Sequence, residues 1–420
     1  MEYKKTEIIK GINLHVINTE KFKTNLLAVF ITTPLAKETV TQNALIPMVL
    51  RRGSKNMPAS EEIARTLEEM YGADFNCGVE KTGDNQVLKF YLETLNDEYL
   101  PEKENLLKNS IDKILEIIFN PHTEKNAFSE EYVNGEKEKL KQIIEGKKDS
   151  KDKYAYERCI EEMYKGKLYS LYKYGYVEDL EKINDKNLYE NYKKMILDSK
   201  IDIFVSGKIQ ENVENIIKEN ENIKRLNPRE AKCTISEEDK QTKEVKEIIE
   251  NTQISQGKLV IGLDVKVENK EQKYAALLYN AILGGTPTSK MFQNVREKES
   301  LAYTAASNYI RNKDIILVRC GIEIENYEKA LKLTKKQIED MKNGQFSEED
   351  IENAKANIIS NIRAIPDEQD TQITYYFGQE FSKYEMKFEE YEEQIRKLTK
   401  QDVQEIAQNI TMDIIYFLRN

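Results

Sequence analysis

Hydrophobic residues in the first half of the chain follow strand and helix periods in turn. An apolar run at 26–31 has the composition of a strand, and the stretch that begins at Ser60 has apolar residues three and four apart, as in a helix. We expect Ser60 to cap this helix, because its hydroxyl can accept a hydrogen bond from a backbone amide. The predicted order is strand, helix, two strands and a long helix, at 26–31, 60–71, 73–79, 86–93 and 106–119.

The second half repeats this order. Its predicted strands and helices lie at 258–267, 274–285, from Ser289 onward, 303–309, 315–324 and 327–341. The alternation in the strand at 303–309 places four residues on one side, namely Tyr303, Ala305, Ser307 and Tyr309. Each half also carries the string Phe-Ser-Glu-Glu, at 128–131 and 346–349, where the serine and the acidic first turn predict a helix start.

These parallels indicate an internal duplication. We expect an α+β protein made of two homologous halves, each an antiparallel-rich sheet with helices packed on one face. The predicted domains are 1–215 and 251–420. The stretch 216–250 is charged, poor in large apolar residues and interrupted by Pro228, so it is predicted to be a surface linker.

Composition and charge narrow the class of protein. Of the 420 residues, 33% are charged, and the net charge of −10 arises from interleaved signs without a long basic stripe. We therefore expect no nucleic-acid partner. No apolar segment reaches the roughly 18 residues that span a bilayer, and the first residues lack the apolar region of a secretory signal. The sequence thus predicts a cytoplasmic protein without a membrane span, whose four scattered cysteines are small buried hydrophobes.

Histidine is too rare for most metal and nucleophile chemistry. The chain has two histidines, His15 and His122, so a zinc site built on paired histidines at helical spacing is impossible. Neither histidine neighbours a nucleophile motif such as G-x-S-x-G, and the chain contains no P-loop and no G-x-G-x-x-G. The simplest interpretation is that both histidines are structural or lie at the surface.

A more specific motif lies at residues 283–303, LGGTPTSKMFQNVREKESLAY. Gly284 and Gly285 allow a turn and a close approach of the backbone to a ligand. Arg296 ends a predicted helix and Tyr303 begins the next strand. A guanidinium and a phenol are both hydrogen-bond donors, suited to a peptide carbonyl or to the oxyanion that develops from it. The alternative is structural, because an arginine near a helix C-terminus stabilises the helix dipole and a strand tyrosine usually packs.

The string GG-x-x-x-S-x-x-F-x-x-V-R-E-K-x-x-L-A-Y in this motif resembles the C-terminal signature of the inverted-zincin peptidases, the pitrilysin, insulinase and mitochondrial processing peptidase superfamily. Gly53, Ser54 and Pro58 are similar to the Gly-Thr…Pro that follows the family's metal motif. Short bacterial members have about this length and two homologous α+β halves. The resemblance therefore implies the same fold for essentially the whole chain.

The family's zinc motif is missing. That motif, H-x-x-E-H, supplies two histidine ligands and a glutamate base. Counted from Gly53, it falls on Ala44, Leu45, Ile46, Pro47 and Met48. The downstream glutamate ligand would fall near Lys141 and Gln142. The resemblance thus implies a degenerate motif at Ala44, Pro47 and Met48, no zinc in this chain and no peptidase activity from it alone.

Heteromeric members of the family divide the work, and this sequence resembles their non-catalytic subunit. The resemblance implies a homologous partner that carries H-x-x-E-H and zinc, while Arg296 and Tyr303, with Gly284 and Gly285, bind the peptide or protein substrate. It also points to bacterial members associated with the 5-aminopentanol modification of elongation factor P. Two alternatives stay open: a degenerate homologue that serves as a scaffold or peptide-binding module without proteolysis, and a stand-alone enzyme of unrelated chemistry.

Overall fold

The computed structural model describes residues 2–102, 104–209, 212–231, 233–235 and 244–420. The chain forms two compact units, each assembled from three separate stretches. Unit 1 consists of Met1–Gly146, Leu171–Thr234 and Pro366–Glu380, and unit 2 of Lys147–Ser170, Ile235–Ile365 and Phe381–Asn420. This division differs from the contiguous domains 1–215 and 251–420 of the sequence prediction, because a short piece of each half belongs to the unit built mainly by the other half.

Unit 1 is built on a six-stranded sheet in the order β1-β2-β6-β3-β5-β4. Its strands are β1 (Glu2–Ile9), β2 (Ile12–Asn18), β3 (Thr24–Pro34), β4 (Asp74–Thr82), β5 (Asn85–Leu95) and β6 (Lys200–Gly207). Strands β2 and β6 are parallel, and the other neighbours are antiparallel. The predicted strands at 26–31, 73–79 and 86–93 are thus confirmed within β3, β4 and β5.

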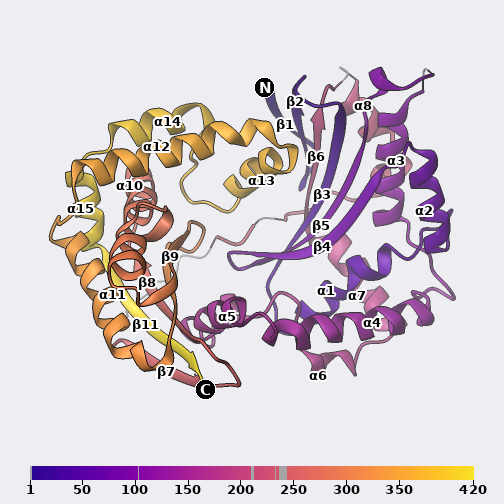
Figure 1. Cartoon of the computed structure of the whole chain (residues 1–420). Coiled ribbons are helices and arrows are strands. Elements are labelled where there is room, and N and C mark those ends of the chain that lie inside the picture. The colour runs from indigo at the N-terminus through magenta and orange to yellow at the C-terminus, as the bar shows by residue number, and fades with distance from the viewer. Residues whose placement is uncertain (1, 103, 210–211, 232, 236–243) are drawn as a thin grey trace. The chain divides into compact units, whose positions relative to one another are not determined.

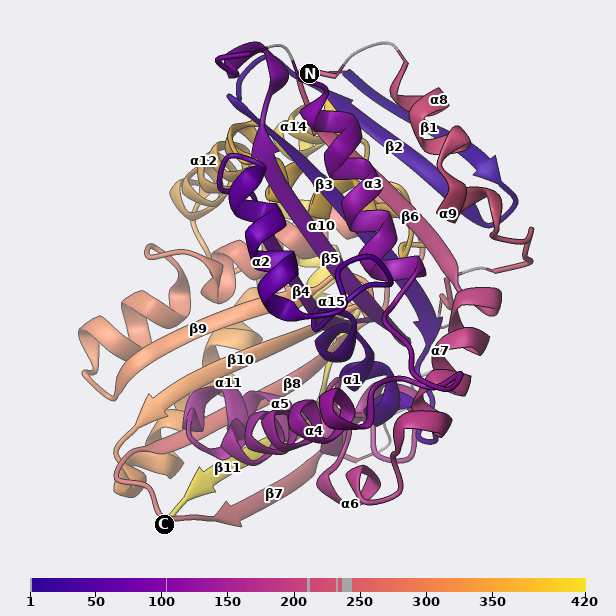
Figure 2. The same cartoon turned by 90° about the vertical axis from the view of Figure 1, so that its right-hand side faces the viewer.

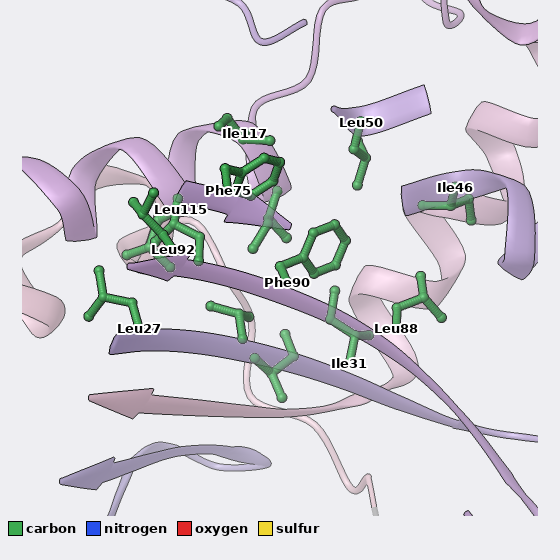
Figure 3. Packing of buried hydrophobic residues seen from close by; sticks show 14 of the residues in the cluster. Leu27, Ile31, Ile46, Leu50, Phe75, Leu88, Phe90, Leu92, Leu115 and Ile117 are labelled. Atoms are coloured by element: carbon green, nitrogen blue, oxygen red, sulfur yellow. The ribbon is translucent and has the colours of Figure 1, made fainter. Parts of the chain in front are cut away.

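One face of this sheet carries the main hydrophobic core of unit 1. The helices are α1 (Val40–Leu50), α2 (Ser60–Glu69), α3 (Leu106–Phe119), α4 (Glu130–Glu145), α6 (Val177–Leu180), α7 (Asp185–Asp198), α8 (Val213–Glu219) and α9 (Glu221–Lys224). Figure 3 shows Ile46 and Leu50 of α1 beside Leu88 and Phe90 of β5, all four of them buried. Helix α3 has the predicted bounds, since its apolar stripe and its flanking Asn120-Pro121 were both readable.

Unit 2 repeats the arrangement with a five-stranded sheet in the order β7-β11-β8-β10-β9. Its strands are β7 (Lys246–Asn251), β8 (Gly257–Val265), β9 (Ala302–Ile310), β10 (Ile315–Ile322) and β11 (Ile410–Arg419). Here β7 and β11 are the parallel pair, as β2 and β6 are in unit 1. Five strands of each unit therefore follow the same order and directions, which confirms the α+β class and the predicted repeat of two halves.

The helices of unit 2 follow the order of those in unit 1. They are α10 (Lys270–Asn280), α11 (Tyr327–Lys342), α12 (Glu348–Ala364), α14 (Phe388–Lys397) and α15 (Lys400–Gln408), with two π-helical segments, η4 (Ala281–Gly285) and η5 (Met291–Lys298). The Phe-Ser-Glu-Glu strings behave differently. Ser347 caps α12 through a reciprocal capping box with Asp350, whereas Ser129 precedes α4 without a side-chain cap. Ser60 is the first residue of α2, not its cap, since Ala59 occupies that position.

Two helices at equivalent places in the halves are exchanged between the units. Helix α5 (Lys151–Met163) follows α4 in the chain but packs on the sheet of unit 2, as Figure 2 shows. Helix α13 (Gln369–Gln379) follows α12 but packs on the sheet of unit 1, beside β3 and β6 (Figure 1). Each lies on the sheet face opposite the unit's other helices, which adds a second covered face to the predicted single one.

Aromatic contacts hold α13 on unit 1, beside a buried polar network. Phe377 packs against Phe30 with ring centroids 4.5 Å apart, and Tyr376 stacks on Tyr3 at 3.8 Å. Beside them, the fully buried carboxylate of Asp202 accepts hydrogen bonds from His15 at 3.0 Å and Lys200 at 2.6 Å. His15 is thus a structural histidine, as the sequence suggested.

The described residues at both ends of the stretch 216–250 belong to the two units. Ile217 in α8 and Ile223 in α9 are buried in the core of unit 1, and β7 is an edge strand of unit 2. A few buried apolar residues at one end and strand pairing with β11 at the other are therefore enough to anchor a segment whose composition resembles a linker. Residues 236–243 lie outside the described residues.

Candidate functional site

The positions predicted to hold a degenerate metal motif lie in the middle of α1 and belong to the core. Ala44 is 2% exposed, and Leu45 and Ile46 are fully buried. Pro47 is also buried, and Met48 is half-buried against the same core. The positions that would hold zinc ligands and a base in the family are thus occupied by side chains that pack and that offer no metal ligand apart from the weak thioether of Met48.

The polar groups around α1 are committed to other partners. On the facing helix α4, the buried Glu136 carboxylate accepts a hydrogen bond from Lys139 at 2.6 Å and lies 3.5 Å from Arg52. Cys77 of β4 donates to the carbonyl of Pro47 at 3.3 Å, and burial raises the pKa of its thiol to about 11. Because a thiol binds metal as thiolate, Cys77 is a poor substitute ligand.

The two glycines of the second motif are required by packing. They end η4, which lies against β9. A Cβ on Gly284 would stand 2.6 Å from the backbone nitrogen of Ser307 in β9, and a Cβ on Gly285 would stand 2.9 Å from the side-chain amide of Asn280. Gly284 therefore allows η4 to approach the strand closely. Substrate binding by these glycines stays a prediction, since this packing alone explains them.

Arg296 lies on η5 with its side chain 42% exposed. Its guanidinium carbon stands 4.5 Å from the centre of the Phe292 ring, and its Nε is 3.7 Å from the carboxylate of Glu297. The stacked ring restricts the orientation of the guanidinium and leaves N–H donors at its edge for a ligand. A π-helical segment at this place is notable, since such irregular turns are frequent at functional sites.

Tyr303 lies at an irregularity of β9. The pairing with β10 runs from Gly321 opposite Thr304 to Ile322 opposite Ala302, so Tyr303 is the extra residue of a bulge. The predicted alternation placed Tyr303 with the buried residues Ala305, Ser307 and Tyr309. That prediction is wrong for Tyr303, which is 61% exposed, because the bulge re-aims its side chain.

The phenol of Tyr303 is held as a donor. Its hydroxyl donates to Glu323, just beyond β10, at 2.6 Å. This hydrogen bond to a carboxylate raises the pKa of Tyr303, so the phenol stays protonated at neutral pH. Arg296 and Tyr303 thus lie on adjacent packed elements of unit 2, both exposed, and no hydrogen bond joins them in the described part of the chain. Glu323 was missed by the sequence analysis, since an acidic residue after a strand carries no specific signal.

Arg296 and Tyr303 present hydrogen-bond donors at the surface of unit 2. Two donors can orient a carbonyl group and stabilise negative charge on it. Among the residues that the structure describes, no group of three His, Cys, Asp or Glu side chains could hold a metal ion. Within the same ranges, no helix is both long and apolar enough to cross a membrane.

Comparisons with known proteins agree with this arrangement. The model of the "Peptidase M16 inactive domain" family matches residues 182–358. The chain is 35% identical over 413 residues to the "Probable inactive metalloprotease YmfF" of Bacillus subtilis, covering 97% of this chain and 96% of that protein.

Solved structures resemble the whole chain. A conserved protein from Enterococcus faecalis V583 matches with a TM-score of 0.90 and 29% identity, over 100% of this chain and 99% of that one. A protease from Helicobacter pylori matches with a TM-score of 0.81 and 13% identity, over 100% of both chains. The second likeness shows the fold alone.

Proposed function

The chain belongs to the peptidase M16 family as an inactive homologue, and from that premise we propose that it is the non-catalytic subunit of a heterodimeric zinc peptidase. The family that residues 283–303 suggested, the inverted zincins, is thereby confirmed. In the proposed complex a homologous partner carries H-x-x-E-H and the zinc. This chain supplies Arg296 and Tyr303 as substrate-binding residues.

The observation that carries the proposal is the contrast in exposure between the two motifs. The positions of the metal motif have become core, whereas Tyr303 is 61% exposed on a bulge and its phenol is oriented by Glu323. An exposed tyrosine held by one hydrogen bond contributes little to folding. Its oriented, protonated hydroxyl is suited to a ligand that reaches this edge of unit 2.

The chemistry assigned to this chain is donation of hydrogen bonds. Tyr303 would release Glu323 and donate to the carbonyl oxygen of the scissile peptide, and Arg296 would donate beside it. Both bonds strengthen as negative charge develops on that oxygen, which is how a binding group lowers an activation barrier. The partner's residues would supply the base and the metal-bound water.

The test is Tyr303→Phe in the complex reconstituted with an H-x-x-E-H homologue. The substitution removes one hydroxyl and keeps the ring, so we expect peptide turnover to fall about 100-fold to 1,000-fold, the usual effect of losing an oxyanion donor. Thermal melts of the variant should match those of the wild type. Tyr99→Phe, at a 50% exposed tyrosine of unit 1, is the matched control and should leave turnover unchanged. Wild-type turnover by Tyr303→Phe would contradict the proposal.

A second candidate function is that of a scaffold or peptide-binding module without proteolysis. The packed interior of α1 favours it, because nothing in that helix is kept for catalysis. The two functions differ in one result. For a scaffold without proteolysis, adding this chain to an H-x-x-E-H homologue would not raise peptide cleavage, and Tyr303→Phe would change nothing.

The compartment and the biological role complete the proposal. We expect the complex to act in the cytoplasm, where the four cysteines, all free in the structure, would stay reduced. The link to 5-aminopentanol modification of elongation factor P rests on resemblance alone. Deleting the gene and measuring the mass of elongation factor P tests it, and an unchanged mass would remove this part of the proposal.

A further inference from the structure

An exposed arginine lies on an internal strand of the sheet of unit 2. Arg319 belongs to β10, which has β8 on one side and β9 on the other. The flanking residues of β10 are buried and apolar, and Leu317 packs under α5 on the same face. A charged residue in a strand with neighbours on both sides is unusual unless its charge is used.

The side chain of Arg319 is oriented by a stacking contact. Its guanidinium carbon lies 5.3 Å from the centre of the Tyr156 ring in α5, and Asn308 of β9 donates to the Tyr156 hydroxyl at 3.4 Å. Among the described residues no carboxylate forms an ion pair with Arg319. Stacking leaves the N–H groups at the edge of a guanidinium available for a planar anion. Arg319 is therefore oriented but not neutralised.

Arg319 shares a row of exposed residues with Tyr303. Ala306, directly opposite Arg319 on β9, has a small side chain, and Thr304 and Asn308 on either side of it are exposed. Tyr303 lies three residues before Ala306 in the chain. At about 3.3 Å per residue this separation is about 10 Å along the strand, or about three residues of an extended peptide. The exposed residues are thus Tyr303, Thr304 and Asn308 of β9 and Arg319 of β10.

We propose that Arg319 selects an acidic side chain in the bound peptide, about three residues from the peptide bond held at Tyr303. This inference rests on the proposed function and names the substrate class of the same site. Carboxylate is the group that matches a stacked, fixed guanidinium, because its two oxygens accept two parallel N–H bonds. We expect about a tenfold preference for the acidic peptide over its amide analogue.

The experiment compares peptides that are identical except at one scanned position, occupied by Asp, Asn or Lys. Turnover by the reconstituted pair is measured as kcat/KM, and binding of the fluorescein-labelled peptides to the full chain alone is measured by anisotropy. Wild type should prefer Asp at one position. Arg319→Gln should remove that preference and keep turnover of the Asn peptide, and Arg319→Glu should favour Lys. Arg65→Gln, at an exposed arginine of α2, is the matched control and should change nothing.

The outcomes separate this inference from the function on which it rests. Equal use of Asp and Asn peptides at every position, with turnover still lowered by Tyr303→Phe, would overturn the role of Arg319 and leave the proposed function intact. If Tyr303→Phe has no effect, the proposed function fails, and anisotropy alone then decides whether the full chain prefers the Asp peptide through Arg319. If Arg319→Gln melts early, Arg319→Lys keeps the positive charge and should retain part of the preference.

Discussion

The two motif regions of this duplicated chain differ in exposure. In unit 1 the motif positions on α1 are core, and Ala44 is 2% exposed. In unit 2 the motif between η4 and β9 keeps Arg296 and Tyr303 exposed, with Tyr303 re-aimed by a bulge. The comparison teaches that packing alone accounts for the predicted motif positions on α1, whereas side chains that cost the fold little and are exposed and oriented are the ones to examine for binding.

Restoring the first histidine of the metal motif should have the largest effect on stability. Ala44→His puts a larger, polar ring into the packed interior of α1. Overpacking costs about 1–3 kcal/mol and an unpaired buried polar group about 1–3 kcal/mol, so unfolding in urea should require about 2–6 kcal/mol less free energy.

Met48→His is the matched control for that substitution. Met48 is half-buried, so its replacement should cost clearly less than Ala44→His. Metal content after dialysis is measured alongside the unfolding curves. A double variant that folds normally and retains one zinc per chain would show that the helix is still a latent metal site, and the contrast between the two regions would break down.

A smaller effect is expected at Gly284. Its replacement by alanine places a Cβ 2.6 Å from the nitrogen of Ser307, so η4 must shift away from β9, at a cost of about 1–3 kcal/mol. Gly135→Ala in the middle of α4 meets nothing within 4 Å and should instead stabilise the chain by about 0.5–1 kcal/mol. Both values come from urea unfolding. If Gly284→Ala keeps full stability but weakens peptide binding, the glycine serves the ligand more than the fold.

The smallest expected effect is a dependence of stability on pH, which should differ between the two units. Burial lowers the pKa of His15, a shift that the hydrogen bond to Asp202 only partly opposes. Below about pH 6.5 the unfolded chain therefore binds more protons than the folded chain. The contribution of His15 to the free energy of unfolding should be fully present above that pH, and it should be lost as the pH falls through the lower pKa of the folded state. Burial alone would raise the pKa of Asp202, but hydrogen bonds from His15 and the charge of Lys200 lower it to about 2. The contribution of Asp202 is thus lost only at much lower pH.

Hydrogen exchange at pH 7.5 and 5.5 checks this pH effect. Both histidines of the chain belong to unit 1, so acid should lower the protection factors, which compare exchange with the intrinsic rate at each pH, in β2 and β6 and leave those of β8 and β10 nearly unchanged. His15→Gln should reduce the difference between the two pH values. His122→Gln is the control and should preserve it. An equal loss of protection in both sheets would mean that the buried network around Asp202 is not the acid-sensitive element.

The sequence predicts individual helices and strands better than it predicts which sheet each helix packs on. A period-two run located β4, the turn that follows it located β5, and an apolar stripe with clear ends located α3, since these signals are local. The exchange of α5 and α13 could not be predicted in this way. The apolar face of α5 shows that the helix is buried, but the sheet that buries it is chosen by long-range packing of residues such as Tyr154 and Cys159.

Local signals likewise point to some residues of the candidate site but not to their surroundings. The sequence pointed to Arg296 and Tyr303 through one motif, but a single-residue bulge in β9 decides that Tyr303 is exposed. Arg319 could have been noticed as a charge inside the apolar strand IILVRCGIEI. Its stacking on Tyr156 depends on the exchanged helix and was not readable from the strand alone.

The central claim is that this chain contributes binding but no catalysis, and a titration tests it most directly. A fixed amount of an H-x-x-E-H homologue is mixed with increasing amounts of this chain, while peptide cleavage and zinc content are measured. The account predicts little cleavage by either chain alone, activity that rises and saturates at equal amounts, and zinc that stays with the homologue. Cleavage by the homologue alone at the full rate, or zinc and cleavage in this chain alone, would contradict it.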